Sequence, residues 1–164
     1  MAIPGLSTLG IEVGYAIVTT TASLPASVTV LPRCNSADGI EITQNSIDAS
    51  ALEDYVTQHV AGRADTPETW GMTFNNTPDA RTAVAGMISA YATSKASDSD
   101  TVVCIEIYDP KDTGGAYWLF IEPPSILGMS ELSQNTLKTF PLTSALVTVY
   151  GYSTGVAPDD GGSN

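Results

Sequence analysis

The sequence predicts a mainly β protein with one α-helix, folded as an antiparallel β-sandwich or incomplete barrel that this helix flanks. Three observations predict the class. Only residues 77–95 show clear helical periodicity. Several short segments instead alternate apolar and polar side chains between turns rich in glycine and proline, which is typical of antiparallel strands. No run reaches the roughly 18 apolar residues of a membrane span.

The predicted helix has a well-defined start. Thr77 is a good N-cap, Pro78 suits the first helical position, and Asp79 places negative charge at the positive end of the helix dipole. Apolar residues then recur with a period near 3.6 and predict a face packed against the core. This stripe consists of Ala80, Ala83, Val84, Met87, Ile88 and Tyr91.

Strands are expected on both sides of this helix. The expected ranges are 11–17, 27–31, 39–47, 67–76, 101–108, 116–122, 136–140 and 144–152. Residues 101–108 and 116–122 are joined by the turn DPKDTGG and predict a hairpin. Both of these strands are apolar on both faces, so each needs cover on two sides. We expect the helix to cover one face and a neighbouring subunit to cover the other.

Residues 48–66 are read as a long connecting loop. Their apolar residues fit helical spacing, but a helix there would have no room to pack between two strands. Loops of this length inside a compact domain are usually functional or disordered, and the apolar content argues against disorder. We therefore expect this loop to contact another subunit or ring through Leu52, Glu53, Asp54, Tyr55, Val56, His59, Val60 and Arg63.

The length of 164 residues predicts one domain. We expect a β domain over residues 1–154, with an N-terminal arm at 1–10 and the long loop at 48–66, followed by a flexible tail at 155–164. The first ten residues have neither a basic stretch nor a continuous apolar run, so no secretory signal is expected.

Charge and cysteine content exclude several functions. Six Lys and Arg residues against 18 Asp and Glu residues give a net charge of −12, which argues against gripping nucleic acid. Cys34 and Cys104 lie far apart in no metal or redox motif. Two buried thiols are the favoured interpretation, and a disulfide between them stays open.

A search for catalytic chemistry finds no set of residues that could carry it. The single histidine, His59, has no metal-ligand spacing around it, and the adjacent Glu53 and Asp54 diverge on any regular element. Glu106 and Glu122 could approach across the hairpin, where like charges are unfavourable. We therefore expect no enzyme activity, no cofactor and no metal, and a structural role instead.

Residues 39–87 carry a resemblance to a known family. A strand ends near Ser46-Ile47-Asp48-Ala49-Ser50, a turn-like Ala61-Gly62-Arg63 follows, then the strand ETWGMTFNN, and Thr77-Pro78-Asp79 opens the helix. This order resembles the major tail tube proteins of tailed bacteriophages, of the long non-contractile type. The pattern covers about a third of the chain, and it is also similar to contractile-tail tubes and to the tube protein of type VI secretion.

The resemblance implies a β-sandwich or incomplete barrel with one helix, assembling as hexameric rings that stack into a hollow tail tube for DNA passage. It implies a virion protein made in the host cytoplasm, with a tape-measure protein, a tail terminator and a distal tail protein as partners. DNA would pass without specific binding, and no membrane span is expected. An appended immunoglobulin-like domain of many family members is not expected here.

The polar faces of the strands beside the long loop are the expected lumen lining. These residues are Glu41, Thr43, Asn45, Thr69, Thr73 and Asn75. Two other classes stay open beside the tube subunit. A monomeric β-sandwich binding module would expose an aromatic platform, for which Tyr150 and Tyr152 are the obvious pair. An enzyme would need a polar cluster that the sequence does not show.

Overall fold

The structure is a computed structural model that describes residues 10–112 and 115–159. Within these residues the elements follow one another in a simple order. They are β1 (Glu12–Val18), β2 (Thr29–Val30), β3 (Cys34–Ala37), β4 (Thr43–Asp48), β5 (His59–Asp65), β6 (Thr69–Asn75), α1 (Pro78–Ser97), β7 (Val102–Tyr108), β8 (Gly115–Glu122) and β9 (Thr139–Thr154).

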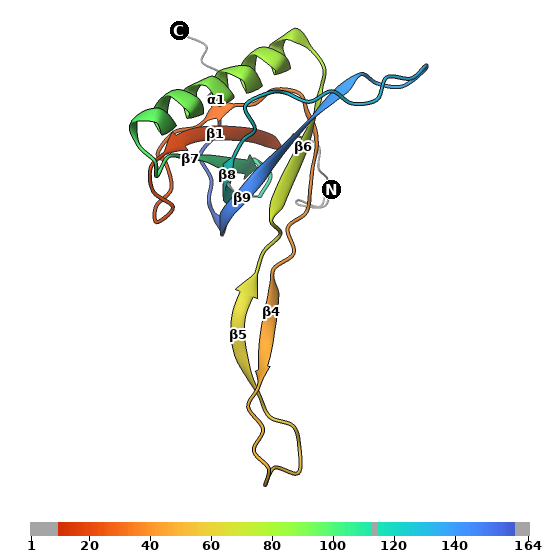
Figure 1. The fold of residues 1–164 in the computed structure, drawn as a ribbon. Coiled ribbons are helices and arrows are strands. Elements are labelled where there is room, and N and C mark those ends of the chain that lie inside the picture. Colours follow the sequence, from red (N-terminus) through yellow and green to blue (C-terminus); the bar gives the residue numbers. More distant parts are fainter. Residues whose placement is uncertain (1–9, 113–114, 160–164) are drawn as a thin grey trace.

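Seven of the described strands form one antiparallel sheet in the order β2-β1-β7-β8-β9-β6-β3. The sheet curls around α1, and β4 and β5 form a separate ribbon that extends away from it (Figure 1). Its two edges, β2 and β3, do not pair with each other. The predicted class is confirmed, and of its two forms the sheet adopts the incomplete barrel.

The helix begins where the sequence predicted and ends two residues later, at Ser97. The Thr77 hydroxyl accepts a hydrogen bond from the Ala80 amide at 3.2 Å, as an N-cap does. Near the other end, the Lys95 ammonium donates to the Glu122 carboxylate at 3.0 Å and so joins the helix to β8. These contacts hold α1 across the concave side of the sheet.

The main core lies between α1 and the curled sheet. The helix contributes the buried side chains of its predicted stripe, Ala80, Val84, Met87 and Ile88. The strands contribute alternate residues, which include Trp70, Met72 and Phe74 of β6 and Leu119 and Ile121 of β8. Phe74 stacks on Phe140 across the β6–β9 pair with ring centroids 5.4 Å apart.

The second face of β7 and β8 is covered by the same chain, so the expectation of a neighbouring subunit there is wrong. Cys104, Trp118 and Phe120 are fully buried in a second apolar cluster. Val28 and Val156, from segments far apart in the sequence, pack over this cluster. A sheet buried on both faces needed two covers, and the connection after β1 together with the C-terminal segment supplies the second one.

Residues 155–159, here called the strap, lie against this second face. Asp159 forms a parallel bridge with Thr29, and its amide donates to the Val28 carbonyl at 2.9 Å. The Val156 amide donates to a carboxylate oxygen of Glu106 at 3.3 Å. The tail expected to be flexible from residue 155 is therefore packed over 155–159, whereas residues 160–164 and the N-terminal arm up to residue 9 lie outside the described residues.

Several predicted elements differ from the structure in extent. The strand expected over 39–47 begins only at Thr43, as β4. Residues 34–37, expected in a loop, form β3 on the edge of β6. Residues 136–140 and 144–152, expected as two strands, belong largely to the single long strand β9. Pro141 interrupts the alternation of apolar and polar residues in the sequence, but it lies opposite Thr73 in the β6–β9 pair. Register shifts in the β8–β9 pair, beside Trp118 and Phe120, accommodate the bend of β9. Among the described residues, no helix combines the length and apolar content that a membrane crossing needs.

Candidate assembly surfaces

The ribbon of β4 and β5 forms a long arm, defined here as residues 42–66 and called the hairpin arm (Figure 1). Its antiparallel register runs from Thr43 opposite Asp65 to Asp48 opposite His59. The prediction of a loop over residues 48–66 is therefore wrong for residues 59–65, which are a strand. Pairing with β4 satisfies the backbone of β5. Propensity did not indicate this strand because it contains Gly62 and two alanines, which are depleted in strands.

The tip of the hairpin arm, residues 49–58, closes the ribbon through its own hydrogen bonds. The Ala49 amide donates to the Gln58 carbonyl at 2.9 Å, and the Gln58 amide donates to the Ser50 hydroxyl at 2.7 Å. The Ala51 amide donates to the Asp54 carboxylate at 2.7 Å. Hydrogen bonds from Ser50 lower the pKa of Asp48 at the end of β4. The tip is thus locally ordered without any contact to the core.

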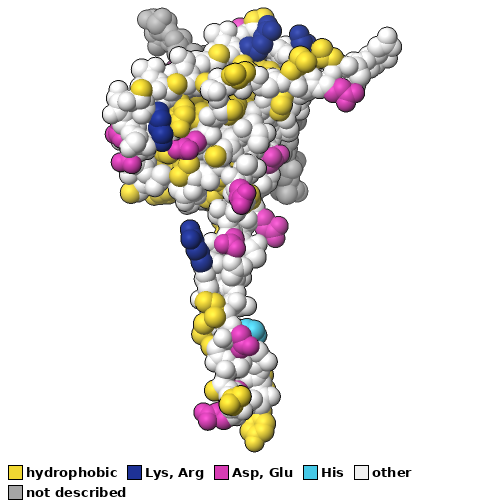
Figure 2. Space-filling model, viewed as in Figure 1, with side chains coloured by type: hydrophobic (Ala, Val, Ile, Leu, Met, Phe, Trp, Pro, Cys, Tyr) yellow, Lys and Arg dark blue, Asp and Glu magenta, His cyan; other side chains and the backbone are white. Residues whose placement is uncertain are grey.

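Apolar side chains on this arm have no cover within the chain. Leu52 and Tyr55 at the tip are fully exposed, at 109% and 104% of their reference areas. Further exposed apolar residues on the arm are Ile42, Ile47, Val56 and Val60. Figure 2 shows these hydrophobic side chains along the arm, next to acidic groups at its end. Such a surface is typical of an interaction site.

All eight residues predicted for the subunit interface lie on this arm and are exposed. Leu52, Glu53, Asp54, Tyr55 and Val56 are on the tip, and His59, Val60 and Arg63 are on β5. The structure brings them together on one extended element. Their role in assembly stays a prediction.

The six residues predicted for the lumen are divided between two places. Glu41, Thr43 and Asn45 are exposed where the hairpin arm begins, and the Asn45 amide donates to Asp65. The others, Thr69, Thr73 and Asn75, lie on β6, on the face opposite the buried Trp70, Met72 and Phe74.

Threonines of β9 extend the polar face of β6. Thr139 lies opposite Asn75 and Thr143 lies opposite Gly71, so their side chains share one face of the sheet with Thr69 and Thr73. Asp38 adds a carboxylate there, because its Oδ2 atom is 2.9 Å from the position that a Cβ on Gly71 would occupy. The sequence did not indicate that Thr139 and Thr143 belong to this polar face, because only the pairing of β9 with β6 places their side chains there.

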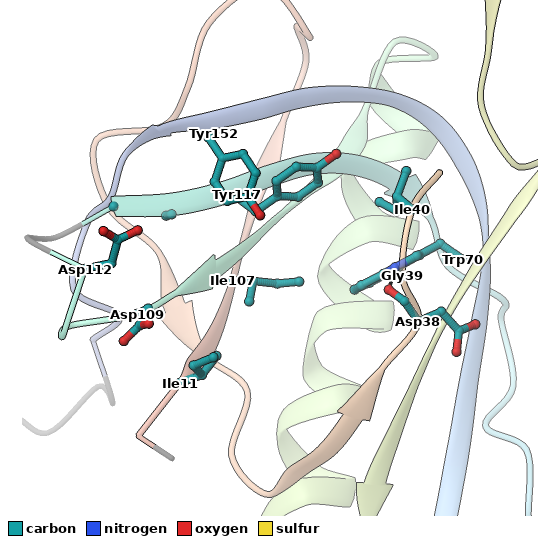
Figure 3. Close-up of a pocket in the computed structure, with 12 residues that line it drawn as sticks. Ile11, Asp38, Gly39, Ile40, Trp70, Ile107, Asp109, Asp112, Tyr117 and Tyr152 are labelled. Atoms are coloured by element: carbon teal, nitrogen blue, oxygen red, sulfur yellow. Dashed lines mark hydrogen bonds between the residues drawn. The ribbon is translucent and has the colours of Figure 1, made fainter. Parts of the chain in front are cut away.

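A groove of about 370 Å³ opens between the start of β8, the end of β9 and residues 38–40 (Figure 3). Ile107 lies on its floor, and Tyr117 and Tyr152 lie side by side along it, with ring centroids 4.8 Å apart at 77°. Asp109 and Asp112 stand at one end. Burial raises the pKa of Tyr117, with the nearby Tyr152 as a second cause. We call this the tyrosine groove.

The two cysteines and the carboxylates of β7 and β8 lie away from the tyrosine groove. Burial raises the pKa of Cys34 to about 11 and that of Cys104 to about 12, and both thiols are free. Within the described part of the chain, no group of three or more His, Cys, Asp or Glu residues could hold a metal ion. Glu106 lies opposite Trp118 in the ladder and Glu122 opposite Ala145, and Glu122 instead pairs with Lys95.

Known proteins were compared with the chain by sequence and by structure. No family model and no curated protein matches the sequence. A chain in the six-fold symmetrised baseplate of the anti-feeding prophage matches the structure with a TM-score of 0.57 at 11% identity, over 94% of this chain and 98% of that one. The two chains share a fold.

Two further structures give weaker matches. A chain in the tail of an empty GTA particle has a TM-score of 0.46 at 11% identity, covering 89% of this chain and 96% of that one. A chain in the cap that terminates the anti-feeding prophage tube has a TM-score of 0.49 at 12% identity, covering 86% and 88%. These two likenesses are too weak to support a fold assignment by themselves.

Another exposed segment escaped sequence reasoning. Residues 124–138, between β8 and β9, are here called the projection. Its first part lies against the body, where Leu127 packs on the main core, and the rest extends outward (Figure 1). Its exposed large apolar side chains are Ile126, Met129, Leu132 and Leu137. The apolar residues between turn-forming Pro124 and Gly128 were the available signal, but without regular spacing they indicated no element.

Proposed function

We propose that this chain is a structural subunit of a phage-tail-type particle, whose copies assemble into stacked, six-membered rings that form the hollow tail tube. The observation that carries this proposal is the hairpin arm, whose apolar tip has no contact with its own core. The likeness over nearly the whole chain to a subunit of a six-fold symmetrised prophage baseplate supports the same class of particle. The resemblance over residues 39–87 supports the tube role in particular.

The exposed tip needs a partner for energetic reasons. Fully burying a large apolar side chain stabilises a contact by about 1.5–3 kcal/mol, and Leu52, Tyr55 and Val56 are together on the tip. The β4–β5 ribbon extends roughly 20 Å from the body, at about 3.3 Å per residue. An arm of that reach can contact a neighbouring subunit or the next ring while its own sheet stays intact.

The polar face of β6 and β9 is the surface that best suits a lumen. Thr69, Thr73 and Thr143 present hydroxyl groups there without a basic side chain to bind phosphate. A chain with a net charge of −12 repels DNA over short distances, which favours passage without binding. In this proposal Glu41, Thr43 and Asn45 continue the lining at the base of the hairpin arm.

The proposal includes the wider setting of a tail. Copies of the chain are its main partners, and a tape-measure protein, a tail terminator and a distal tail protein would contact the tube along its bore and at its ends. The location is the virion, after synthesis in the host cytoplasm. The role is structural and needs neither catalysis nor a cofactor.

Replacing the tip tests the proposal. Asp48 lies opposite His59, so residues 49–58 can be exchanged for Asn-Gly, which closes a two-residue hairpin between these positions. We expect the variant to keep the melting temperature of the original chain, because the tip contacts no core residue, and to form no tubes. Negative-stain microscopy and thermal unfolding measure the two results.

A matched control keeps the tip and changes its chemistry. Leu52→Gln with Tyr55→Gln removes the apolar surface at the same backbone length, whereas Thr57→Ser changes an exposed polar position on the same tip. Tubes should be lost in the first variant and kept in the second. Normal tubes from the Asn-Gly variant would contradict the role of the arm, and an original chain that stays monomeric at every salt concentration would contradict the tube itself.

A further inference from the structure

The projection has the composition of a docking segment for an acidic chain. Residues 124–138 contain one acidic residue, Glu131, and one basic residue, Lys138, so the segment has no net charge although the chain carries −12. Its large apolar side chains are exposed, with Met129 at 72% and Leu132 at 58%. The Ser133 hydroxyl lies 2.9 Å from that of Thr136, a local contact that shapes the turn. The segment therefore offers an apolar surface with little charge repulsion.

The tyrosine groove offers a matching receptor. Its lining is apolar where Ile40, Ile107 and Tyr117 meet, and Tyr152 on its side is 83% exposed. Asp109 and Asp112 at one end and Asp38 at the other discourage acidic ligands (Figure 3). The tip of the hairpin arm carries Glu53 and Asp54 beside its apolar residues and would meet that repulsion. The neutral projection would not, so of the two exposed apolar segments it is the better occupant.

The projection does not occupy the groove of its own chain, because no residue of 124–138 is among those that line it. The projection leads into β9 at Thr139, and Tyr152 lies 13 residues further along the same strand, beside the start of β8. At about 3.3 Å per residue this is roughly 40 Å of strand. Because the projection lies outside the groove of its own chain, a projection seated there would come from another copy. Such a head-to-tail contact between different surfaces generates closed rings or filaments.

We propose that the projection of one copy docks in the tyrosine groove of the next copy and makes the contact between neighbours. The inference rests on the proposed function, because it names the surfaces through which the copies associate. Met129 and Leu132 enter the apolar part of the groove. Lys138, at the base of the projection, is the basic group nearest in sequence to them and suits the carboxylates that line the groove.

Two variants each disable one of the two surfaces that make this contact. Met129→Gln with Leu132→Gln removes the apolar surface of the projection without adding charge, and Tyr152→Asp adds a carboxylate to the groove at an exposed position. Each change should weaken the contact at least about 10-fold per lost apolar side chain and abolish assembly. Val147→Gln and Tyr150→Asp change exposed residues of β9 outside both surfaces and should leave assembly unchanged.

Mixing the two defective variants gives the deciding measurement. The projection variant keeps an intact groove and the Tyr152→Asp variant keeps an intact projection, so one productive contact remains in the mixture. Sedimentation velocity should show each variant alone as a monomer and the mixture as a 1:1 dimer. A misfolded variant would not complement its partner, so complementation also shows that both are folded.

Cross-linking locates the contact in the unaltered assembly. p-Benzoylphenylalanine at Met129 should attach to the peptide that contains Tyr117 or Tyr152 of another copy, as mass spectrometry would show. If the original chain forms tubes and the two variants also form them, the inference is wrong and the proposed function stands. If the original chain stays monomeric and binds an oligosaccharide in a Tyr152-dependent way, the groove is a sugar site, and both proposals are overturned.

Discussion

Glu106 shows at the scale of one residue how the fold places a polar group among apolar ones. It lies in β7 between Gly14 of β1 and Trp118 of β8, and it is completely buried. Burial raises the pKa of its carboxyl to about 7, the hydrogen bond from the Val156 amide opposes this rise, and the charge of Glu12 adds to it. Periodicity could not reveal this, because the covering strap is 50 residues away in the sequence.

A pH dependence of stability follows from that shift. The pKa of Glu106 is higher in the folded state, at about 7, than its ordinary 4.5, so the folded chain binds the proton more tightly. Stability from this group is complete below about pH 4.5 and is lost as the pH rises through 7. We expect Glu106→Gln to be more stable than the original chain at pH 8, by on the order of 1–3 kcal/mol, and to lose most of that advantage at pH 4.5.

Urea unfolding of both chains between pH 4 and 9 measures this difference. Comparison with the glutamine variant cancels the contribution of titrating groups that do not interact with Glu106. A matched control is Glu131→Gln on the projection, where the side chain is exposed and little difference is expected at any pH. A stability difference that does not change with pH would show that Glu106 titrates normally.

At the scale of the element, α1 has a strong N-terminal capping signal, but a glycine lowers the helix propensity of its interior. Gly86 lies in the middle of the helix, and a Cβ built there meets no atom within 4 Å. Glycine is unfavourable in a helix because it loses more backbone freedom on folding than alanine does. The packed stripe, rather than helix propensity, therefore holds this segment in place.

Gly86→Ala should stabilise the protein. The expected gain is about 0.5–1 kcal/mol in the free energy of unfolding, because the new methyl group has open space and the unfolded chain loses freedom. For a chain of this size the melting temperature should rise by about 1–4 °C, which calorimetry can measure.

The same substitution at Gly14 provides a contrast of opposite sign. A Cβ there would lie 2.9 Å from Cγ2 of Val28 and 3.3 Å from Cβ of Pro158, beneath the connection and the strap. Gly14→Ala should destabilise the protein by about 1–3 kcal/mol. If both substitutions shift stability in the same direction, the second face of the sheet is not covered as described.

At the scale of the whole molecule, the acidic charge opposes association of identical copies. Each copy carries a net charge of −12, and the exposed apolar surfaces of the hairpin arm and projection must overcome the resulting repulsion. Salt shortens the range of this repulsion to about 8 Å at physiological ionic strength and to about 3 Å at 1 M. Assembly is therefore expected to be favoured by salt.

Light scattering across a NaCl series tests this expectation. The assembled fraction should rise between about 20 mM and 1 M NaCl at constant protein concentration, since salt screens the net repulsion between copies and leaves the apolar contacts intact. The tip variant with Asn-Gly should remain unassembled across the whole series. Assembly that weakens with added salt would mean that ion pairs between copies, rather than apolar contacts, hold them together.

The sequence by itself determined the fold class, the helix with its cap and buried stripe, and the β7–β8 hairpin. Those features depend on spacing and turn chemistry within a few residues, which a sequence displays directly. It also located the exposed arm by its apolar residues, although the interface and lumen roles stay predictions. Only the tertiary structure decided that β5 pairs with β4, that the strap and Val28 cover the second face, and that a groove opens beside Tyr152. Each of these depends on contacts between distant segments, which local periodicity cannot encode.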